Sequence, residues 1–175
     1  MKSTKEAIVS KLNTSTPPPL EYITPSTKYN DVLEVFEQNA LKAGAKLYRD
    51  KDISQIYPNL KNVVDTRYEY SNQIDNLNEC ELLILYPSLA IAQNGAIWIE
   101  PTSYPKELIT LTQHIAIVLN SKDIVSNMKE GYDRIDFTDI STGLFISGPS
   151  KTADIEQALV IGAHGAISLS IFIQE

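Results

Sequence analysis

Residues 145–156 read Phe145-Ile-Ser-Gly-Pro-Ser-Lys-Thr-Ala-Asp-Ile-Glu156, and they predict a strand that turns directly into a helix. An apolar strand over residues 144–147 precedes the Gly-Pro-Ser turn, and the helix is expected to begin near Thr152. Because a helix N-terminus presents free backbone N–H groups, such a turn suits an anion. The helix is expected to end at the loop Gly162-Ala-His-Gly165, before a strand over residues 169–173.

The rest of the chain shows the same alternation of apolar strands and helical patterns. The run Leu82-Leu-Ile-Leu85 is continuously apolar, which is typical of a strand buried on both faces. Further strands are expected over residues 45–48, 62–65, 96–99 and 115–119, and helices over 31–43, 105–112 and from Ser121 through Tyr132, with a helical turn over 87–92. The alternation predicts an α/β fold of three layers, with a mainly parallel sheet and helices on both faces.

Length and composition limit how many domains the chain can have and which kinds of protein it can be. The 175 residues fit one domain over residues 29–175, preceded over residues 1–28 by a short N-terminal helix and an arm containing Pro17-Pro-Pro19. The sequence has neither an apolar run of about 18 residues nor a signal-peptide pattern, so a cytoplasmic protein without a membrane span is expected. The net charge of −7 argues against nucleic acid as a partner.

Few residues are available for metal or redox chemistry. Cys80 is the only cysteine, so the chain alone holds neither an internal disulfide nor an iron–sulfur cluster. His114 and His164 are the only histidines and lack metal-ligand spacing, so no metal site is expected.

The Gly-Pro-Ser turn is the first candidate site. Ser147, Gly148 and Ser150 would hold a phosphate or carboxylate with hydroxyl and backbone N–H groups; equally, Ser150 would simply cap the expected helix. Asp154 is expected to face the turn, whereas Glu156 points to another face of the helix.

Two other loops carry candidate residues. His164 lies between glycines, which lets the loop present the imidazole to a pocket, although a histidine in a helix-ending loop is more often a hydrogen-bonded structural residue than a catalytic one. Gln93, Asn94 and Gly95 form a turn that offers amide donors and acceptors. The candidate ligand-binding set is therefore Gln93, Asn94, Gly95, Ser147, Gly148, Ser150, Asp154, His164 and Gly165, with no catalytic residue assigned.

Three of these motifs, in this order, resemble the LUD-domain family, specifically the lactate-utilisation protein C type. They are Ala92-Gln-Asn-Gly-Ala96, the stretch over residues 145–156, and Gly162-Ala-His-Gly165. The resemblance implies the fold shared by ribose-5-phosphate isomerase, glucosamine-phosphate deaminase and family I CoA transferases. Two positions depart from the family pattern: Gln93 stands where Glu is usual, and Ala166 stands where Pro often follows the His-Gly pair.

The resemblance also implies a function. The chain would be a component of an L-lactate utilisation system, which oxidises lactate to pyruvate, with the iron–sulfur clusters on partner subunits and no cofactor in this chain. It would bind a small carboxylate or phosphate, or organise the cluster-bearing partners. A stand-alone isomerase or acyl/CoA-transfer enzyme is the alternative, but the neutral amide of Gln93 is a poor covalent nucleophile. A ligand-free scaffold and a homo-oligomer also stay open.

Overall fold

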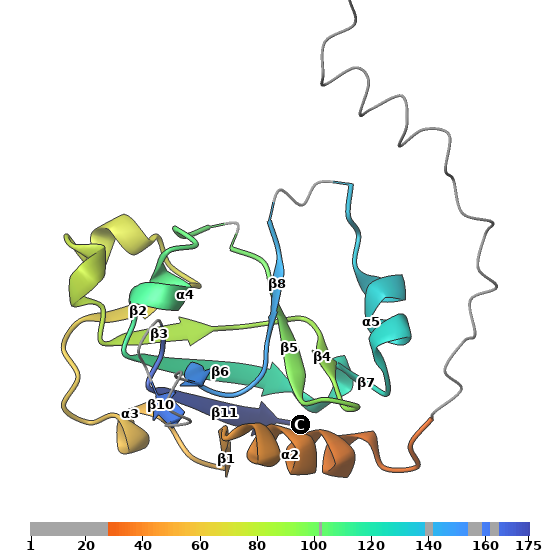
Figure 1. The fold of residues 1–175 in the computed structure, drawn as a ribbon. Coiled ribbons are helices and arrows are strands. Elements are labelled where there is room, and N and C mark those ends of the chain that lie inside the picture. The colour runs from red at the N-terminus through yellow and green to blue at the C-terminus, as the bar shows by residue number, and fades with distance from the viewer. Residues whose placement is uncertain (1–27, 102, 139–141, 154–158, 162–164) are drawn as a thin grey trace, which may run out of the picture.

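The computed structural model describes residues 28–101, 103–138, 142–153, 159–161 and 165–175. Its centre is a five-stranded parallel sheet in the order β1-β11-β6-β3-β2. The strands are β1 (Lys46–Arg49), β2 (Val63–Asp65), β3 (Leu82–Leu85), β6 (His114–Asn120) and β11 (Ser168–Gln174). The strands that were expected from apolar runs are therefore present, and Figure 1 shows them side by side.

Helix α2 (Val32–Ala43) begins and ends where its sequence directs. The Asp31 side chain accepts a hydrogen bond from the Glu34 N–H at 2.8 Å, and Gly44 ends the helix in a left-handed conformation with φ of 97°. Phe36 and Ala40 on the inner side of the helix are fully buried. Burying a side chain as large as Phe36 contributes about 1.5–3 kcal/mol to stability.

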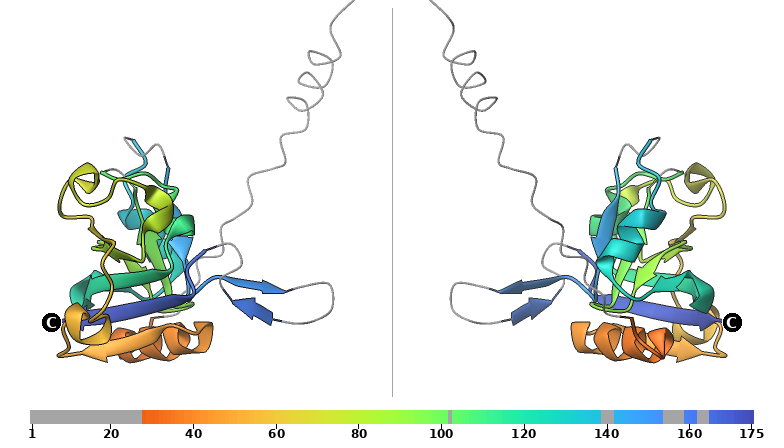
Figure 2. Two further views of the ribbon diagram at one scale, coloured as in Figure 1. Left: turned by 90° about the vertical axis from the view of Figure 1, so that its left-hand side faces the viewer. Right: turned by 90° about the vertical axis from the view of Figure 1, so that its right-hand side faces the viewer.

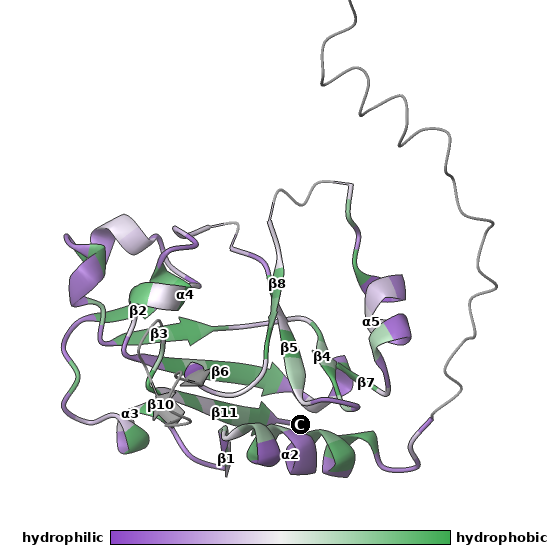
Figure 3. Ribbon diagram, in the orientation of Figure 1, coloured by the Kyte–Doolittle hydropathy of each residue, from purple (hydrophilic) through white to green (hydrophobic). Residues whose placement is uncertain are grey.

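Helices cover both faces of the parallel sheet, as the sequence predicts. Leu83, Ile117 and Ile171 pack on the side of α2 and α4 (Leu108–Leu111). On the opposite side, residues such as Ile84 and Phe172 pack against α3 (Ile53–Ile56) and its flanking residues. Figure 3 shows the hydrophobic residues concentrated in the strands, and the two groups of buried residues place the core on both sides of this sheet.

A second, smaller sheet stands beside the first. It contains β4 (Ala90–Ile91), β5 (Ala96–Ile99), β7 (Ile124–Val125) and β8 (Leu144–Ile146), in the order β7-β4-β5-β8. β5 pairs antiparallel with both β4 and β8, whereas β4 and β7 are parallel. α5 (Met128–Arg134) packs against β4 and β7. Because β8 belongs to this sheet, the Gly-Pro-Ser turn does not follow a strand of the parallel sheet.

The prediction of a helix from Thr152 is wrong for its first residues. Residues Lys151–Ala153 form strand β9, which pairs antiparallel with β10 (Leu159–Ile161). Figure 2 shows these two strands projecting away from both sheets. The Gly-Pro-Ser pattern gives a local helix-start signal, but the backbone groups of residues 151–153 pair with a strand instead of with a following helical turn. The N-terminus that was expected to present N–H groups to an anion is therefore not formed at residues 151–153.

Two other helical expectations are also wrong. Pro87–Ala92 contains strand β4, and the helix expected from Ser121 is broken into a 3-10 helix (Ser121–Asp123), strand β7 and helix α5. Ile124 and Val125 pair in register with Ala90 and Ile91, so strand pairing replaces the helical stripe. Two further 3-10 helices, Tyr70–Asn72 and Leu77–Glu79, are the remaining elements among the described residues.

The N-terminal helix and Pro-rich arm expected over residues 1–28 lie almost wholly outside the described residues, so they stay predictions. Within the described part of the chain, no helix is both long and apolar enough to cross a membrane.

Candidate functional site

The Gly-Pro-Ser turn after β8 is fixed against the C-terminal end of helix α2. Gly148 adopts a left-handed conformation with φ of 72°, and a Cβ added there would lie 2.2 Å from the Ala43 carbonyl oxygen. The Lys151 ammonium donates to the same Ala43 carbonyl. Only glycine allows this close approach, so Gly148 serves the packing of the turn as well as its shape.

The turn of Gln93, Asn94 and Gly95 connects β4 to β5 and lies on the same helix. Asn39 of α2 donates through Nδ2 to the carbonyls of Ala92 and Gln93, at 2.8 and 3.2 Å. Gly95 has φ of 65°, and an added Cβ would lie 2.6 Å from the backbone nitrogen of Ala40. The turn is therefore clamped to α2 by a side chain and by direct backbone packing.

The side chains of this turn are engaged locally. The Asn94 side chain accepts from the Ala96 N–H at 3.1 Å, which closes the turn. The exposed Gln93 accepts through Oε1 from the Met128 N–H at the start of α5, at 3.4 Å. Gln93 thus bridges the turn to α5 rather than pointing to the Gly-Pro-Ser turn.

The candidate turns contact one another. Exposed Ser147 donates through Oγ to the Asn94 carbonyl at 3.1 Å. Ser150 donates its N–H to the Ala166 carbonyl at 2.9 Å, and a Cβ added at Gly165, where φ is 148°, would lie 3.1 Å from the Ser150 Cβ. Three segments that are far apart in sequence are therefore joined in space.

Four of the candidate residues line a cavity of about 240 Å³ between β8, α4 and the start of β11. Ser147, Gly148, Ser150 and Gly165 form one side of it, and aliphatic side chains form much of the rest. Its full lining is Ile109, Thr110, Ile115, Leu144, Ile146, Ser147, Gly148, Pro149, Ser150, Gly165, Ala166 and Leu169. Gln93, Asn94 and Gly95 are not among these residues, and Asp154 and His164 lie outside the described part of the chain.

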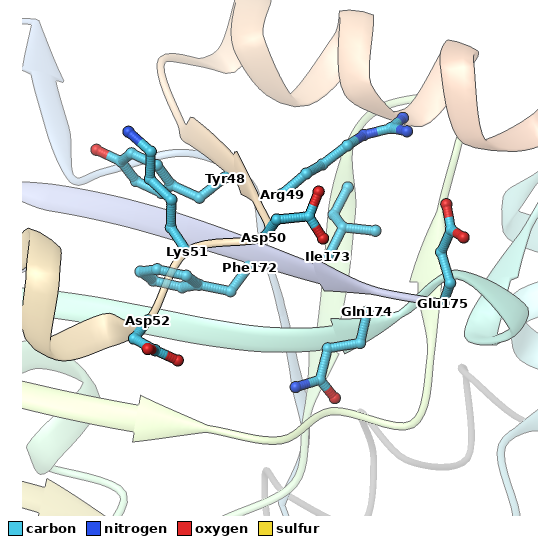
Figure 4. Close-up of a pocket in the computed structure, with 9 residues that line it drawn as sticks. All are labelled: Tyr48, Arg49, Asp50, Lys51, Asp52, Phe172, Ile173, Gln174 and Glu175. Atoms are coloured by element: carbon cyan, nitrogen blue, oxygen red, sulfur yellow. The ribbon is translucent and has the colours of Figure 1, made fainter.

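A larger cavity, of about 360 Å³, was not anticipated from the sequence. It lies at the carboxyl ends of β1 and β11, the edge where open α/β sheets usually bind ligands. Figure 4 shows its residues: Tyr48, Arg49, Asp50, Lys51, Asp52, Phe172, Ile173, Gln174 and Glu175. The run Arg49-Asp-Lys-Asp52 after a strand was the available signal, but the pairing of β1 with β11 completes the cavity and is not encoded locally.

Charges at this larger cavity are partly matched. Arg49 pairs with Glu37 of α2 at 2.7 Å, and Tyr48 stacks on Phe172 with ring centroids 5.1 Å apart. Asp50 has φ of 55°, which is unusual for a residue with a side chain. Both basic and acidic side chains line the cavity, so its charge does not favour one class of ligand.

A polar cluster lies at the carboxyl ends of β2 and β3, beside a cavity of about 150 Å³. Arg67 pairs with Asp65 at 2.7 Å and lies over the Tyr86 ring, 4.5 Å from its centroid. Burial acts to raise the pKa of Asp65, but the hydrogen bonds from Arg67 outweigh it and the pKa is lowered. Burial, together with the Asp65 charge, raises the pKa of Tyr86 to about 12.

The remaining residues of chemical interest have structural surroundings. Cys80 is buried, and burial raises the pKa of its thiol, as expected for an inert cysteine. His114 contacts Ser168 Oγ through Nδ1 at 2.8 Å, and burial lowers its pKa. Among the described residues, no group of three or more His, Cys, Asp or Glu side chains is arranged to hold a metal ion.

The chain is similar to known proteins in two comparisons. The model of the LUD domain matches residues 19–173, most of the chain. The fold is similar to the crystal structure of a DUF162 family protein from Deinococcus radiodurans, with a TM-score of 0.58 and 15% identity, over 81% of this chain and 95% of that one. None of the curated proteins matches the chain significantly. The family match spans the motifs at residues 92–96, 145–156 and 162–165. Because it covers most of the sequence, the chain belongs to the LUD domain family.

Proposed function

We propose that this chain is a non-redox component of an L-lactate utilisation system and that it binds a small carboxylate such as lactate or pyruvate. Membership of the LUD domain family, which is associated with lactate utilisation, supports the pathway. The lactate-utilisation protein C type rests on the sequence motifs alone. In this proposal the iron–sulfur clusters are carried by partner subunits, because one cysteine cannot supply the ligands of a cluster.

The observation that carries the proposal is the cavity of about 240 Å³ beside the Gly-Pro-Ser turn. Pockets for drug-sized ligands are roughly 300–1,000 Å³, so a smaller cavity suits a metabolite of a few atoms. Ser150 offers a hydroxyl donor on one side, which suits a carboxylate, whereas the Ser147 hydroxyl already donates to the Asn94 carbonyl. Ile146 and Leu169 offer apolar surface on other sides, which suits the methyl group that lactate and pyruvate share.

The site in this proposal is smaller than the candidate set drawn from the sequence. Ser147, Gly148, Ser150 and Gly165 form it, with His164 and Asp154 kept as candidates from outside the described residues. Gln93, Asn94 and Gly95 act by holding the turn that carries Ser147. In this proposal the Ser150 hydroxyl replaces the helix N-terminus that was expected to bind the anion.

Thermal unfolding of the purified chain tests the proposal. The panel is L-lactate, pyruvate, phosphate, sugar phosphates and CoA, each added to the same protein. A ligand that binds only the folded state stabilises it by about 2.7 kcal/mol at a hundredfold excess over its dissociation constant. We expect a rise in midpoint with lactate or pyruvate that shrinks in Ser150→Ala and in His164→Ala.

A matched control separates binding from general stability. Ser71 is exposed and lies outside the cavity, so Ser71→Ala should keep the full lactate or pyruvate response. A response to CoA or sugar phosphates alone would favour an acyl-transfer or isomerase enzyme instead. No response to any ligand of the panel would contradict the proposed binding function.

A further inference from the structure

An exposed aromatic surface lies on the second sheet, away from the cavity of the proposed function. Tyr132 of α5 and Phe137 are 51% and 54% exposed. Their rings are stacked with centroids 6.0 Å apart and planes at 20°. Phe145 of β8 lies 5.8 Å from Tyr132 and 4.8 Å from the buried Trp98. We call Tyr132, Phe137 and Phe145 the aromatic surface.

Neighbouring contacts hold this surface in place. Trp98 of β5 contacts both Phe137 and Phe145, at centroid distances of 6.4 and 4.8 Å. A Cβ at Gly143 would lie 2.2 Å from the Trp98 ring, so the chain entering β8 packs closely on the same indole. The rings therefore rest on a fixed base, while two of them stay largely open to solvent. Exposed aromatic rings that are fixed in this way are typical of a binding surface.

The sequence contains a segment whose chemistry fits this surface. Residues 14–20 read Thr-Ser-Thr-Pro-Pro-Pro-Leu and carry no charge. Consecutive prolines favour the polyproline II conformation, which is already extended and loses little entropy on binding. Aromatic-lined surfaces are the usual docking partners of such segments.

The segment is also within reach. Helix α2 and helix α5 both contact β7, so the helix that begins four residues after Lys28 neighbours the sheet that carries the aromatic surface (Figure 1). Pro19 lies nine positions before Lys28, and an extended chain spans about 3.3–3.6 Å per residue, or about 30 Å in all. That length is about the diameter of a small domain. A tether this short gives an effective concentration on the order of millimolar, which favours docking within one chain.

We propose that Pro17, Pro18 and Pro19 dock on the aromatic surface of the same chain. The docked arm covers Tyr132 and Phe137 and fixes residues 17–28 along the second sheet. The proposal is independent of lactate binding, because the aromatic residues do not line the cavity of about 240 Å³.

Paramagnetic broadening in NMR spectra of the full chain tests this proposal. Cys80 is 1% exposed, so a spin label on a Ser15→Cys variant attaches at the new position alone. We expect loss of amide signal at Tyr132, Phe137 and Phe145 when the label is paramagnetic, and recovery when it is reduced. Replacing Pro17, Pro18 and Pro19 together by Ser should abolish this selective loss, and so should Phe137→Ser.

Two controls match these variants. Pro25→Ser changes the arm outside the proline triplet, and Tyr68→Ser removes an aromatic ring that is 63% exposed elsewhere. Both should keep the broadening at the aromatic surface. Absence of selective broadening, or broadening that survives the triple proline variant, would overturn the proposal. Broadening that arises only between a spin-labelled chain and a separate ¹⁵N-labelled chain would place the arm on a second copy and would also overturn it.

Discussion

Gly148 lies so close to Ala43 that a Cβ on the glycine would sit 2.2 Å from the alanine carbonyl oxygen. This contact joins the Gly-Pro-Ser turn to the end of helix α2, and with it one side of the proposed binding cavity. Because the obstacle is backbone and φ is 72°, neither atom can move away cheaply. The turn is therefore positioned by the helix, and its glycine has a packing role that is separate from any ligand.

Gly148→Ala should lower the free energy of unfolding by about 1–3 kcal/mol, because it adds both a clash and left-handed strain. Chemical denaturation of the variant measures the loss. Gly131→Ala is the matched control, since an added Cβ there meets side chains, chiefly the flexible end of Ile91, rather than backbone, and the residue lies in helix α5. A loss at Gly148 no larger than that at Gly131 would contradict the role given to this contact.

Asn39→Ala should destabilise the protein by about 1–3 kcal/mol, because it leaves the carbonyls of Ala92 and Gln93 without their shared donor. Gln38→Ala, on the exposed side of the same helix, should change stability by no more than about 0.5 kcal/mol. Denaturant titration of both variants makes the comparison. Equal effects would show that the clamp from Asn39 contributes little.

Gln93→Glu should restore no acyl-transfer or thioesterase activity, because Gln93 bonds to the start of α5 and does not line the cavity of about 240 Å³. Assays with acyl-CoA substrates measure this directly. Appearance of CoA-transfer activity in Gln93→Glu would reject the binding-subunit account in favour of an enzyme. The stability of the variant should stay within about 1 kcal/mol, since the new carboxylate would take the place of the Gln93 amide at the start of α5, where an acidic side chain is favourable.

Stability should fall as pH rises between the ordinary tyrosine pKa of 10.0 and about 12, in part through Tyr86. In this window the unfolded chain loses the Tyr86 proton while the folded chain keeps it, so the unfolded state binds fewer protons and alkali favours unfolding. Tyr86→Phe removes that contribution and should flatten the dependence of unfolding free energy on pH. An unchanged slope would show that the raised pKa of Tyr86 does not influence stability.

Cys80 should resist alkylation by iodoacetamide in the folded protein and react on unfolding, because its side chain is buried and burial raises the pKa of the thiol. The rate of modification across a denaturant series measures this. Modification in native buffer as fast as in the unfolded protein would mean that the region around β3 opens readily.

The sequence predicts the parallel sheet well, because its signals are local. Asp31 and Gly44 are recognisable helix boundaries, and the run Leu82-Leu-Ile-Leu85 is typical of a strand buried on both faces, which it is. The segment from Lys151 was misassigned because its structure depends on pairing with residues 159–161, which overrides the local helix signal. Ile124 and Val125 were misassigned for the same reason, since they pair with β4.

In the candidate site, too, local motifs were predictable and long-range contacts were not. The motifs identified Ser147, Gly148, Ser150 and Gly165, which do line one cavity. The sequence could not reveal that the Gln93 turn holds Ser147 in place and does not line the cavity itself. That role depends on the hydrogen bond from Ser147 to the Asn94 carbonyl, which joins segments far apart in the sequence. The cavity at Arg49 and Glu175 was missed because it is formed by strands from opposite ends of the domain.

The most direct test of the central claim is an NMR titration of the ¹⁵N-labelled chain with L-lactate and, separately, with pyruvate. We predict saturable shifts of the Ser147, Gly148, Ser150 and Gly165 amides with at least one of the two acids, reduced in Ser150→Ala. Saturable shifts centred instead on Asp50 and Glu175, or none with either acid, would contradict the proposal that the Gly-Pro-Ser turn and Gly165 bind a small carboxylate.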